Sequence, residues 1–556
     1  MHKYLKLLLA TTISSMMLHQ SAVAQTVTAQ EPNSSEEENS EEEDGNPSSA
    51  SFLTSPSLIP SSTSTGIEAS AVYQAQTAGV NSQAATALGA TALRTLSSGL
   101  TGTAKERAAD LATRISVVDA YSNVEASNKL LGRRAINPAA DLTTIVNSTL
   151  SLTADHLDTL GKLEVSHMST FASDGIANID NFATRVDVTS AMVGTELGSI
   201  TTANLSTLVE HLHSSLDGDS LTALKSLEKS HMTTLVGSGD KKIDLTASFD
   251  ASVIKKSVKK FATKAEVTVE FAKAAAPTSA AGVVDLSKID LGAIATNIHA
   301  NLDDDHLAAL QNLSPTHMAS MAIGVDLTSS EINVGNTLSH FATKAEVIVE
   351  FAKAAAPTST ADTSGNIDFS KIDVAGFVKN VHASLDTDHT TALSNLDPSH
   401  MATMAKGTDF SAGLKVDDLS HFATKAEVIV EFAKVAAPTA EAGATGKFDF
   451  ANVKIDDFVT SVNTLNTDNT KALANLDPKH MATMAAGTDL SAGLNADHLN
   501  HFATKAEVVV EFAKVGSKNS TADGFGKFDF SAINIDEYVS TANALDIDST
   551  KALAKL

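Results

Sequence analysis

The chain has 556 residues and a formal net charge of −26, with 66 acidic against 40 basic residues. This length suits several modules better than one domain, and the acidic surface argues against nucleic acid and anionic lipid as electrostatic partners. Cysteine and tryptophan are absent. Disulfides, thiolate metal sites and cysteine nucleophiles are therefore excluded, and the fold must be held together by packing.

The first 24 residues have the pattern of a secretory signal peptide. Lys3 and Lys6 give a basic start, residues 7–18 form a short apolar stretch, and residues 22–24 (Ala-Val-Ala) form a small-residue cleavage site. The apolar stretch is too short for a stable membrane anchor, and the mature chain is expected to have no transmembrane span. We therefore expect export of a bacterial type; a disordered or membrane-resting N-terminus is the alternative.

A low-complexity segment follows at residues 25–65. Two acidic runs lie within residues 36–44, among Ser, Asn and Pro. Because little of this segment can be buried and its like charges repel, we expect disorder. A solvated linker is preferred here over a calcium-attracting tail. The Ala-rich sequence of residues 66–110 predicts an N-terminal helical segment.

A repeated block then decides the class of protein. The sequence Phe-Ala-Thr-Lys-Ala-Glu-Val recurs at intervals of about 80 residues. It starts intact at Phe261, Phe341, Phe422 and Phe502, and in divergent form at Phe182 and Leu111. The predicted units are 111–181, 182–260, 261–340, 341–421, 422–501 and an incomplete sixth at 502–556. Because the sixth unit stops midway, we expect a fragment of a longer protein, and an unusual cap is the alternative.

Each unit is predicted to contain about four helices. Apolar residues at helical spacing predict an amphipathic helix over 422–437, which Pro438 ends. Phe-Asp-Phe at 448–450 then suggests a short strand or an extended tie. Three shorter helices follow, with Asp373 as the cap of the second in the preceding unit. The predicted fold class is all-α: a tandem array, solenoid-like or as separate beads, of about 80-residue four-helix repeats after a disordered acidic segment.

Two polar positions recur within the units. An Asp precedes the third helix in all six, and a His-Met pair follows it in the five units that extend so far. The neighbour of that Asp is His in only three units, whereas helix capping needs only the Asp. Capping is therefore the preferred interpretation. The predicted caps are Asp155, Asp219, Asp305, Asp388, Asp468 and Asp548, together with Asp397 and Asp477 of the Asp-Pro pairs.

The alternative interpretation of these residues is a divalent-cation site in each unit. The candidate ligands are His317, His400 and His480 with Asp305, Asp388 and Asp468, and a third ligand would come from His340, His421 or His501. One histidine per unit is a metal site only if the fold adds two more ligands, so packing is preferred for these histidines. The run at 303–305 (Asp-Asp-Asp) lacks the glycine and the distal glutamate of an EF-hand loop. The sequence therefore predicts no cofactor, and bound calcium or another divalent cation is the alternative.

No catalytic motif is present in the sequence. It lacks G-x-S-x-G, a Walker loop, a dinucleotide fingerprint and H-E-x-x-H. In general character the chain resembles the long, acidic, cysteine-free surface-layer and adhesin proteins of bacteria. We therefore predict a non-enzymatic structural or adhesive protein of the cell surface or extracellular matrix, with self-association or other envelope proteins as partners. The alternative is a secreted or periplasmic ligand-binding array with one site per repeat; an enzyme carried by residues 50–181 is the third and weakest hypothesis.

Overall fold

The structure is a computed structural model. It describes residues 104–130, 138–194, 197, 199–238, 243, 249–276, 285–323, 334–357, 367–410, 413–438, 448, 450, 452–491, 493–517 and 527–555. Within these ranges the chain is helical, with 23 α-helices, α4 to α26, and no β-strand. The predicted all-α class is therefore confirmed. The predicted signal peptide, the acidic linker and most of the segment 66–110 lie outside the described residues.

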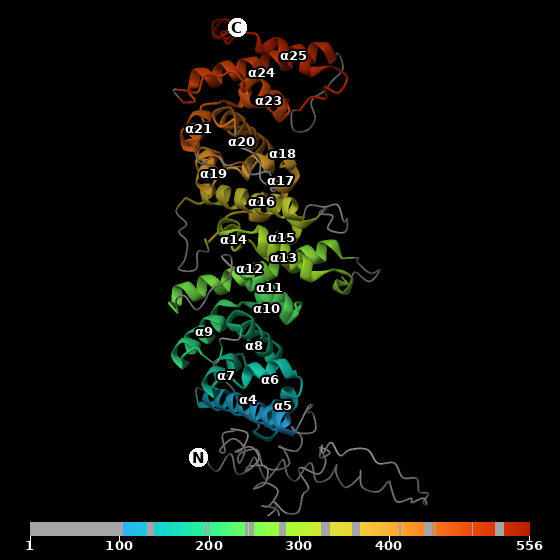
Figure 1. The fold of residues 1–556 in the computed structure, drawn as a ribbon, viewed down its shortest axis with the longest axis vertical. Helices are drawn as coiled ribbons and strands as arrows, with labels where there is room; N and C mark the ends of the chain where they lie inside the picture. The colour runs from blue at the N-terminus through green and yellow to red at the C-terminus, as the bar shows by residue number, and fades with distance from the viewer. Residues whose placement is uncertain are drawn as a thin grey trace, which may run out of the picture. The chain divides into compact units, whose positions relative to one another are not determined.

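The chain divides into two compact units. Unit 1 comprises residues 1–233 and 244–258, and unit 2 comprises residues 234–243 and 259–556. Figure 1 shows the helices of unit 1 in blue and green and those of unit 2 in green to red. Of the described helices, none has both the length and the apolar character needed to cross a membrane.

Unit 1 is built around one aromatic cluster. Its helices are α4 (Ala104–Leu130), α5 (Pro138–Thr149), α6 (Ala154–Leu160), α7 (Val165–Phe171), α8 (Ile179–Val193), α9 (Thr202–Ser215) and α10 (Gly218–Lys225). α11 (Lys229–Val236) and α12 (Ala251–Ala275) have residues in both units. The ring of Phe182 lies 5.5 Å from that of Tyr121 and 6.4 Å from that of Phe171, and all three side chains are buried. These rings join α4, α7 and α8 into one core.

Unit 2 repeats one order of helices: a long helix and then shorter ones. After α12 come α13 (Leu291–Asn301), α14 (Asp304–Leu310) and α15 (Pro315–Ala322). The next are α16 (Val334–Ala355), α17 (Val374–Ser384), α18 (Thr387–Leu393) and α19 (Pro398–Ala405). The last are α20 (Val416–Ala436), α21 (Ile455–Val462), α22 (Thr467–Leu473), α23 (Pro478–Ala485), α24 (Ala496–Ser517), α25 (Ile535–Asn543) and α26 (Ile547–Leu553). We call α16–α19, α20–α23 and α24–α26 helical groups.

The long helix α20 begins earlier than the sequence pattern predicts. It starts at Val416 instead of Phe422 because Asp418 accepts a hydrogen bond from the backbone N–H of Lys415 at 3.2 Å. Leu419 is fully buried and extends the apolar stripe by one turn. The helix ends at Ala436, just before Pro438, as expected where the residue before a proline leaves the helical conformation.

The Phe-Asp-Phe segment acts as a tie and not as a strand in its described residues. The backbone N–H of Phe448 donates to Oδ1 of Asn395 at 2.6 Å, which connects this segment to the group before it. The rings of Phe448 and Phe450 stack with their centroids 5.6 Å apart. Lys434 places its ammonium 4.7 Å from the centroid of the Phe448 ring. These contacts anchor Phe448 to the preceding group and to α20.

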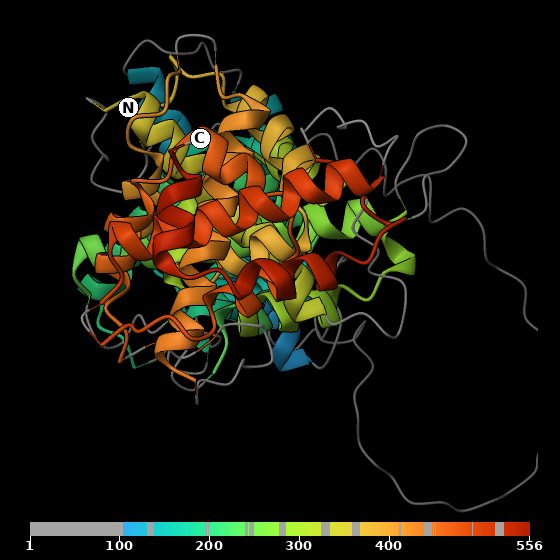
Figure 2. The ribbon, with the colours of Figure 1, turned by 90° about the horizontal axis from the view of Figure 1, so that it is seen from above.

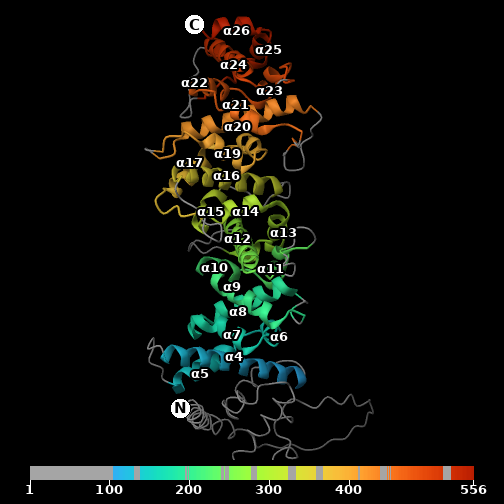
Figure 3. The ribbon, with the colours of Figure 1, turned by 90° about the vertical axis from the view of Figure 1, so that its left-hand side faces the viewer.

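Consecutive groups of unit 2 pack directly against each other. Each long helix lies on the third helix of the group before it: α16 on α14, α20 on α18 and α24 on α22. It also packs against the fourth helix of its own group, as α16 does with α19 and α20 with α23. Figures 1 and 3 show α16, α20 and α24 following one another along unit 2. Each long helix therefore has one side in contact with the preceding group and another with the residues that follow.

Pairs of phenylalanine rings mark these junctions. The pairs Phe271–Phe341, Phe351–Phe422 and Phe432–Phe502 meet edge to face with centroids 4.6, 4.8 and 5.0 Å apart. Each pair joins one long helix to the next. Such contacts contribute about 0.5–1.5 kcal/mol beyond the area they bury.

Candidate functional site at the helix junctions

The short third helices begin at different residues from those predicted. Their N-caps are Thr153, Asp217, Asp303, Asp386, Asn466 and Asp546. The predicted caps Asp155, Asp219, Asp305, Asp388, Asp468 and Asp548 lie two residues later, inside the first turn. The prediction was wrong because the earlier residue holds the extended backbone that a cap needs, with φ −82° and ψ −172° at Asp386. The first-turn acids instead face the positive end of the helix dipole.

In α6, α14, α18 and α22 the residue three positions after the cap closes the helix start in return. The backbone N–H of Asp386 points at Nδ1 of His389 at 3.4 Å, and the N–H of His389 donates to Asp386 Oδ1 at 3.0 Å. This is a capping box in which histidine takes the place usual for Glu or Gln. In α22 the same exchange joins Asn466 and Asn469. The histidines beside the predicted Asp therefore take part in capping themselves.

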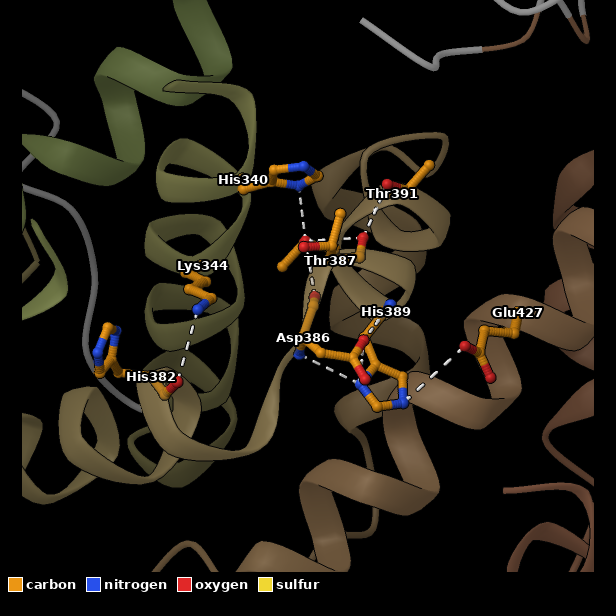
Figure 4. Close-up of polar contacts among 9 residues, drawn as sticks. His340, Lys344, His382, Asp386, Thr387, His389, Thr391 and Glu427 are labelled. Atoms are coloured by element: carbon orange, nitrogen blue, oxygen red, sulfur yellow. Dashed lines mark hydrogen bonds and ion pairs between the residues drawn. The ribbon is translucent and has the colours of Figure 1, made fainter. Parts of the chain in front are cut away.

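The same side chain also reaches a carboxylate of the next group. Nε2 of His389 lies 3.9 Å from Oε1 of Glu427, the Glu of the repeated block in α20 (Figure 4). One group later, Nδ2 of Asn469 donates to Oε1 of Glu507 at 2.8 Å. Figure 4 shows His389 between Asp386 on its own helix and Glu427 across the junction. The junction thus offers a hydrogen-bond donor to a carboxylate, and either an imidazole or an amide can supply it.

Burial and charge shift the ionisation of this trio. Burial raises the pKa of Glu427 to about 7, although the nearby His389 opposes the shift. Burial lowers the pKa of His389, but the hydrogen bond that its protonated ring donates to Asp386 and the charge of Glu427 outweigh it and leave a raised pKa. Burial would raise the pKa of Asp386, whereas its hydrogen bonds with His389 bring that pKa down to about 2. The carboxyl group of Glu427 therefore titrates near neutral pH.

Unit 1 contains a related contact. Nε2 of His156, three residues after the cap Thr153 of α6, lies 2.9 Å from Oδ2 of Asp187 in α8. Asp187 occupies the position of the block's Glu in the divergent copy that starts at Phe182. A shorter acid brings the two side chains closer than in the His389 junction.

One junction assembles three groups that suit a metal ion. Among the described residues, the ligand atoms of Asp303, His306 and Glu346 lie within 4.8 Å of one another. Glu346 is buried in α16, while Asp303 is exposed at the start of α14. One imidazole and two carboxylates would leave an open position for water on a zinc-type ion. The sequence hypothesis named Asp305, which lies inside the first turn, and missed Glu346.

The His-Met histidines meet a different partner from the one hypothesised. Nε2 of His400 lies 3.2 Å from Asp456, and Nε2 of His480 lies 2.9 Å from Asp536. Both acids belong to the second helix of the following group, and no described ion pair joins either histidine to Asp388 or Asp468. His317 accepts the backbone N–H of Ser314 at 3.3 Å, and the charge of Asp373 partly offsets the lowering of the His317 pKa by burial.

These histidines also close the starts of the fourth helices. Asp397 and Asp477 are the N-caps of α19 and α23. Their backbone N–H groups donate to Nδ1 of His400 and His480 at 3.1 and 3.2 Å. With Nδ1 accepting, the neutral ring carries its proton on Nε2. His480 donates this proton to Asp536, and Nε2 of His400 lies near Asp456.

The histidines before the repeated block pair with threonines of their own group. Nδ1 of His340 lies 2.7 Å from Oγ1 of Thr390, and His501 contacts Thr550 at 2.6 Å. His421 makes the same contact with Thr470. Burial, with the charge of Lys425, lowers the pKa of His421 to about 4. These rings are accordingly neutral hydrogen-bonding groups, and the structure does not bring them to the Asp303–His306–Glu346 cluster.

Asparagine ties form a further contact that the sequence analysis missed. Oδ1 of Asn312, Asn395 and Asn475 accepts the backbone N–H of Ile367, Phe448 and Phe528 at 2.7, 2.6 and 2.6 Å. Each tie runs from the end of a third helix to the extended segment of the next group. The recurrence of Asn at this position in register was the signal that could have revealed it.

No family model matches the chain, and no curated protein and no solved structure shows significant similarity to it. The junction geometry therefore carries the functional argument by itself.

Proposed function

We propose that the chain is an exported, non-enzymatic tandem array of about 80-residue four-helix repeats. Its role is structural or adhesive, at the bacterial cell surface or in the extracellular matrix. The observation that carries the proposal is the recurrence of one junction in unit 2. Each long helix places a phenylalanine and a glutamate against the group before it, and an asparagine ties the following segment. A chain whose neighbouring groups complete each other in this way is suited to bear load or to space other molecules.

The junction histidines support this role because they hold elements together. His389 caps its own helix and faces Glu427, and His480 closes α23 and contacts Asp536. The signal-like N-terminus, the acidity and the absence of cysteine agree with a protein that works outside the cell. Self-association and other envelope or matrix proteins are the proposed partners.

The array can be tested by excising one whole interval. Deleting residues 422–501 joins His421 to Phe502 within one long helix, so that His389 should meet Glu507 and Phe351 should meet Phe502. We expect helix content per residue, measured by circular dichroism, to stay unchanged and the melt to remain cooperative. Deleting residues 422–461 removes half an interval and is the matched control, which we expect to aggregate. Equal damage from both deletions would contradict the array.

The proposed location has a separate test. In the producing cell, immunodetection after fractionation should find most of the protein in the envelope or matrix fraction. Recovery as a free soluble monomer in the periplasm would argue against a structural surface role without affecting the array itself.

A ligand-binding array is the second candidate, favoured by the Asp303–His306–Glu346 cluster. In this alternative, each unit holds a divalent cation. Calorimetry with Zn²⁺, Ni²⁺ and Ca²⁺ decides between the two. Saturable binding that loses one ion per chain in Glu346→Gln but keeps it in Glu350→Gln would support the cation site, since Glu350 is equally buried in α16 but outside the cluster. No heat with any of the three ions would remove it.

A further inference from the structure

The junction between α14 and α16 brings three side chains together that can bind one metal ion. The ligand atoms of Asp303, His306 and Glu346 lie within 4.8 Å of one another, and no other three histidine or acidic side chains among the described residues converge so closely. Asp303 and His306 belong to the start of α14, whereas Glu346 lies in α16, which opens the next helical group. An ion shared by these residues would therefore join two consecutive groups.

The imidazole of His306 is oriented for such an ion. Its Nδ1 lies 3.0 Å from Oδ1 of Asp303, and its Nε2 lies 3.9 Å from Oε1 of Glu346. The second distance is too long for a hydrogen bond but is near the separation of two ligands on one ion. Without the ion, Nδ1 accepts the backbone N–H of Asp303 at 3.3 Å. In the other tautomer Nδ1 donates to the Asp303 carboxylate and leaves the lone pair of Nε2 for the ion, as in carboxylate–histidine–zinc sites.

Charge and burial at this junction favour a divalent cation. With a neutral imidazole, Asp303 and Glu346 supply two negative charges, which one divalent cation balances. Glu346 is only 5% exposed, and a buried carboxylate is stable where it is paired or bound to a metal. An imidazole ligand suits Zn²⁺ and Ni²⁺, whereas Ca²⁺ takes oxygen ligands. The expected ion is therefore of the zinc type.

The next junction has the same three residue types but a different charge. Asp386, His389 and Glu427 take the equivalent positions in α18 and α20, with 3.0 and 3.9 Å between the corresponding atoms. The positive charge of Lys527 acts on all three side chains and repels a cation. We therefore expect much weaker ion binding at this junction than at the one between α14 and α16.

The last junction lacks the imidazole. Asn466 and Asn469 take the places of the aspartate and the histidine in α22, and Asn469 donates directly to Glu507 at 2.8 Å. In the view of Figure 2 the red helices of this last group lie in front of the yellow helices of α16–α19. An asparagine at the histidine position thus holds a junction without an ion, and this suggests a variant for the test.

We propose that one divalent cation of the zinc type binds Asp303, His306 and Glu346 and cross-links α14 to α16. In a chain without cysteine, a metal ion can supply the cross-link between distant segments that a disulfide supplies elsewhere. The inference rests on the packing of consecutive groups in the proposed array, but not on the location or role of that array. It differs from the ligand-binding alternative because it places one ion in the chain instead of one in each unit.

The first test uses the full chain and equilibrium dialysis with Zn²⁺. His306→Asn introduces the amide that closes α22 at Asn469 and removes the imidazole ligand. We expect one tightly bound ion in the wild type, which an excess of Ca²⁺ does not displace. Its affinity should fall at least about tenfold in His306→Asn and in Glu346→Gln. Glu427→Gln, at the next junction, is the matched control and should keep the ion. Unchanged affinity in His306→Asn would overturn the proposal.

Hydrogen exchange with and without Zn²⁺ tests the cross-link itself. Bound Zn²⁺ should slow exchange at the amides of α14 and α16 in the wild type but not in His306→Asn, with α22 and α24 as the internal control. Binding without slower exchange would overturn the cross-link. Loss of one ion in Glu346→Gln and of another in Glu427→Gln would support the ligand-binding array and overturn the single ion. The deletion of residues 422–501 leaves this junction intact, so the array and the ion can fail separately.

Discussion

Helices α20 and α24 carry nearly the same sequence yet have different surroundings. Both contain Phe-Ala-Thr-Lys-Ala-Glu-Val and, after one intervening residue, Val-Glu-Phe-Ala-Lys-Val. Phe432 of α20 is fully buried, whereas Phe512 of α24 is 61% exposed. The side chain of Glu431 is 4% exposed and that of Glu511 is 70% exposed. Their first halves do not differ in this way, since Phe422 and Phe502 are both buried against the preceding group.

The comparison shows that each long helix carries two interfaces. One interface packs against the preceding group, and the other packs against the residues that follow the long helix. Glu427 and Glu507 belong to the first kind, and both meet a donor from the third helix of the group before. Phe432 and Phe512 belong to the second kind. An apolar stripe by itself does not say which of its residues will be covered.

The largest expected effect is that of Phe432→Ala compared with Phe512→Ala. Removing a fully buried ring leaves a cavity and should lower the local free energy of unfolding by about 3–5 kcal/mol. The same change at the exposed position should cost under about 1 kcal/mol. Hydrogen exchange at the amides of α20 and α24 measures both, and Phe512→Ala is the matched control. Equal losses would mean that Phe512 is covered in solution.

The pH dependence of the α18–α20 junction is the next effect. The pKa of Glu427 is raised from 4.5 to about 7, so the folded state holds this proton more tightly than the unfolded state does. The resulting stability is fully present below about pH 4 and is lost as the pH rises through about 7. The raised pKa of His389 acts in the same direction. After correction for intrinsic rates, protection of the α18 and α20 amides should fall between about pH 5 and pH 8.

Glu427→Gln should flatten most of this dependence, because the amide has nearly the same shape as the carboxyl group but does not titrate. Asp468→Asn, in the first turn of α22, alters the net charge by the same amount without touching Glu427, and serves as the control. A wild-type profile that is flat in this window would show that the buried carboxylate is stabilised by a group other than those described.

The smallest effect tests where helix α18 is capped. Asp386→Ala removes the side chain that accepts the N–H of His389 and should cost about 1 kcal/mol. Asp388→Ala removes only a favourable charge at the first turn and should cost about 0.3 kcal/mol. Thermal melting of the two variants at neutral pH compares them. A larger loss of stability in Asp388→Ala than in Asp386→Ala would show that Asp388 is the cap, as the sequence predicted.

Several features of the fold could be predicted because they depend on neighbours along the chain. The apolar spacing in residues 422–437 predicts a helix, and Pro438 predicts where it ends. Asp397-Pro398 predicts a helix start for the same reason: a cap and its helix lie within four residues. The sequence wrongly predicted Asp388 as the cap of α18. Asp386, two residues earlier, has the same side chain, and only the backbone conformation shows that Asp386 is the cap.

The candidate site depended on contacts between distant parts of the chain. His389 and Glu427 are 38 residues apart, and Asn395 and Phe448 are 53 apart. Sequence spacing predicts that such residues recur in register, but not which of them meet. The cation hypothesis therefore named Asp305 where the structure assembles Asp303, His306 and Glu346.

The amino-acid sequence by itself determined that this protein is helical and free of disulfides, and that one block recurs at intervals of about 80 residues. Periodicity and capping are local, so they can be inferred from neighbouring residues alone. The tertiary structure decided which glutamate is buried, which side chain a histidine such as His389 or His480 faces, and which of the equivalent residues Phe432 and Phe512 is buried. Burial depends on what packs against a helix, and two nearly identical helices, α20 and α24, have different packing partners.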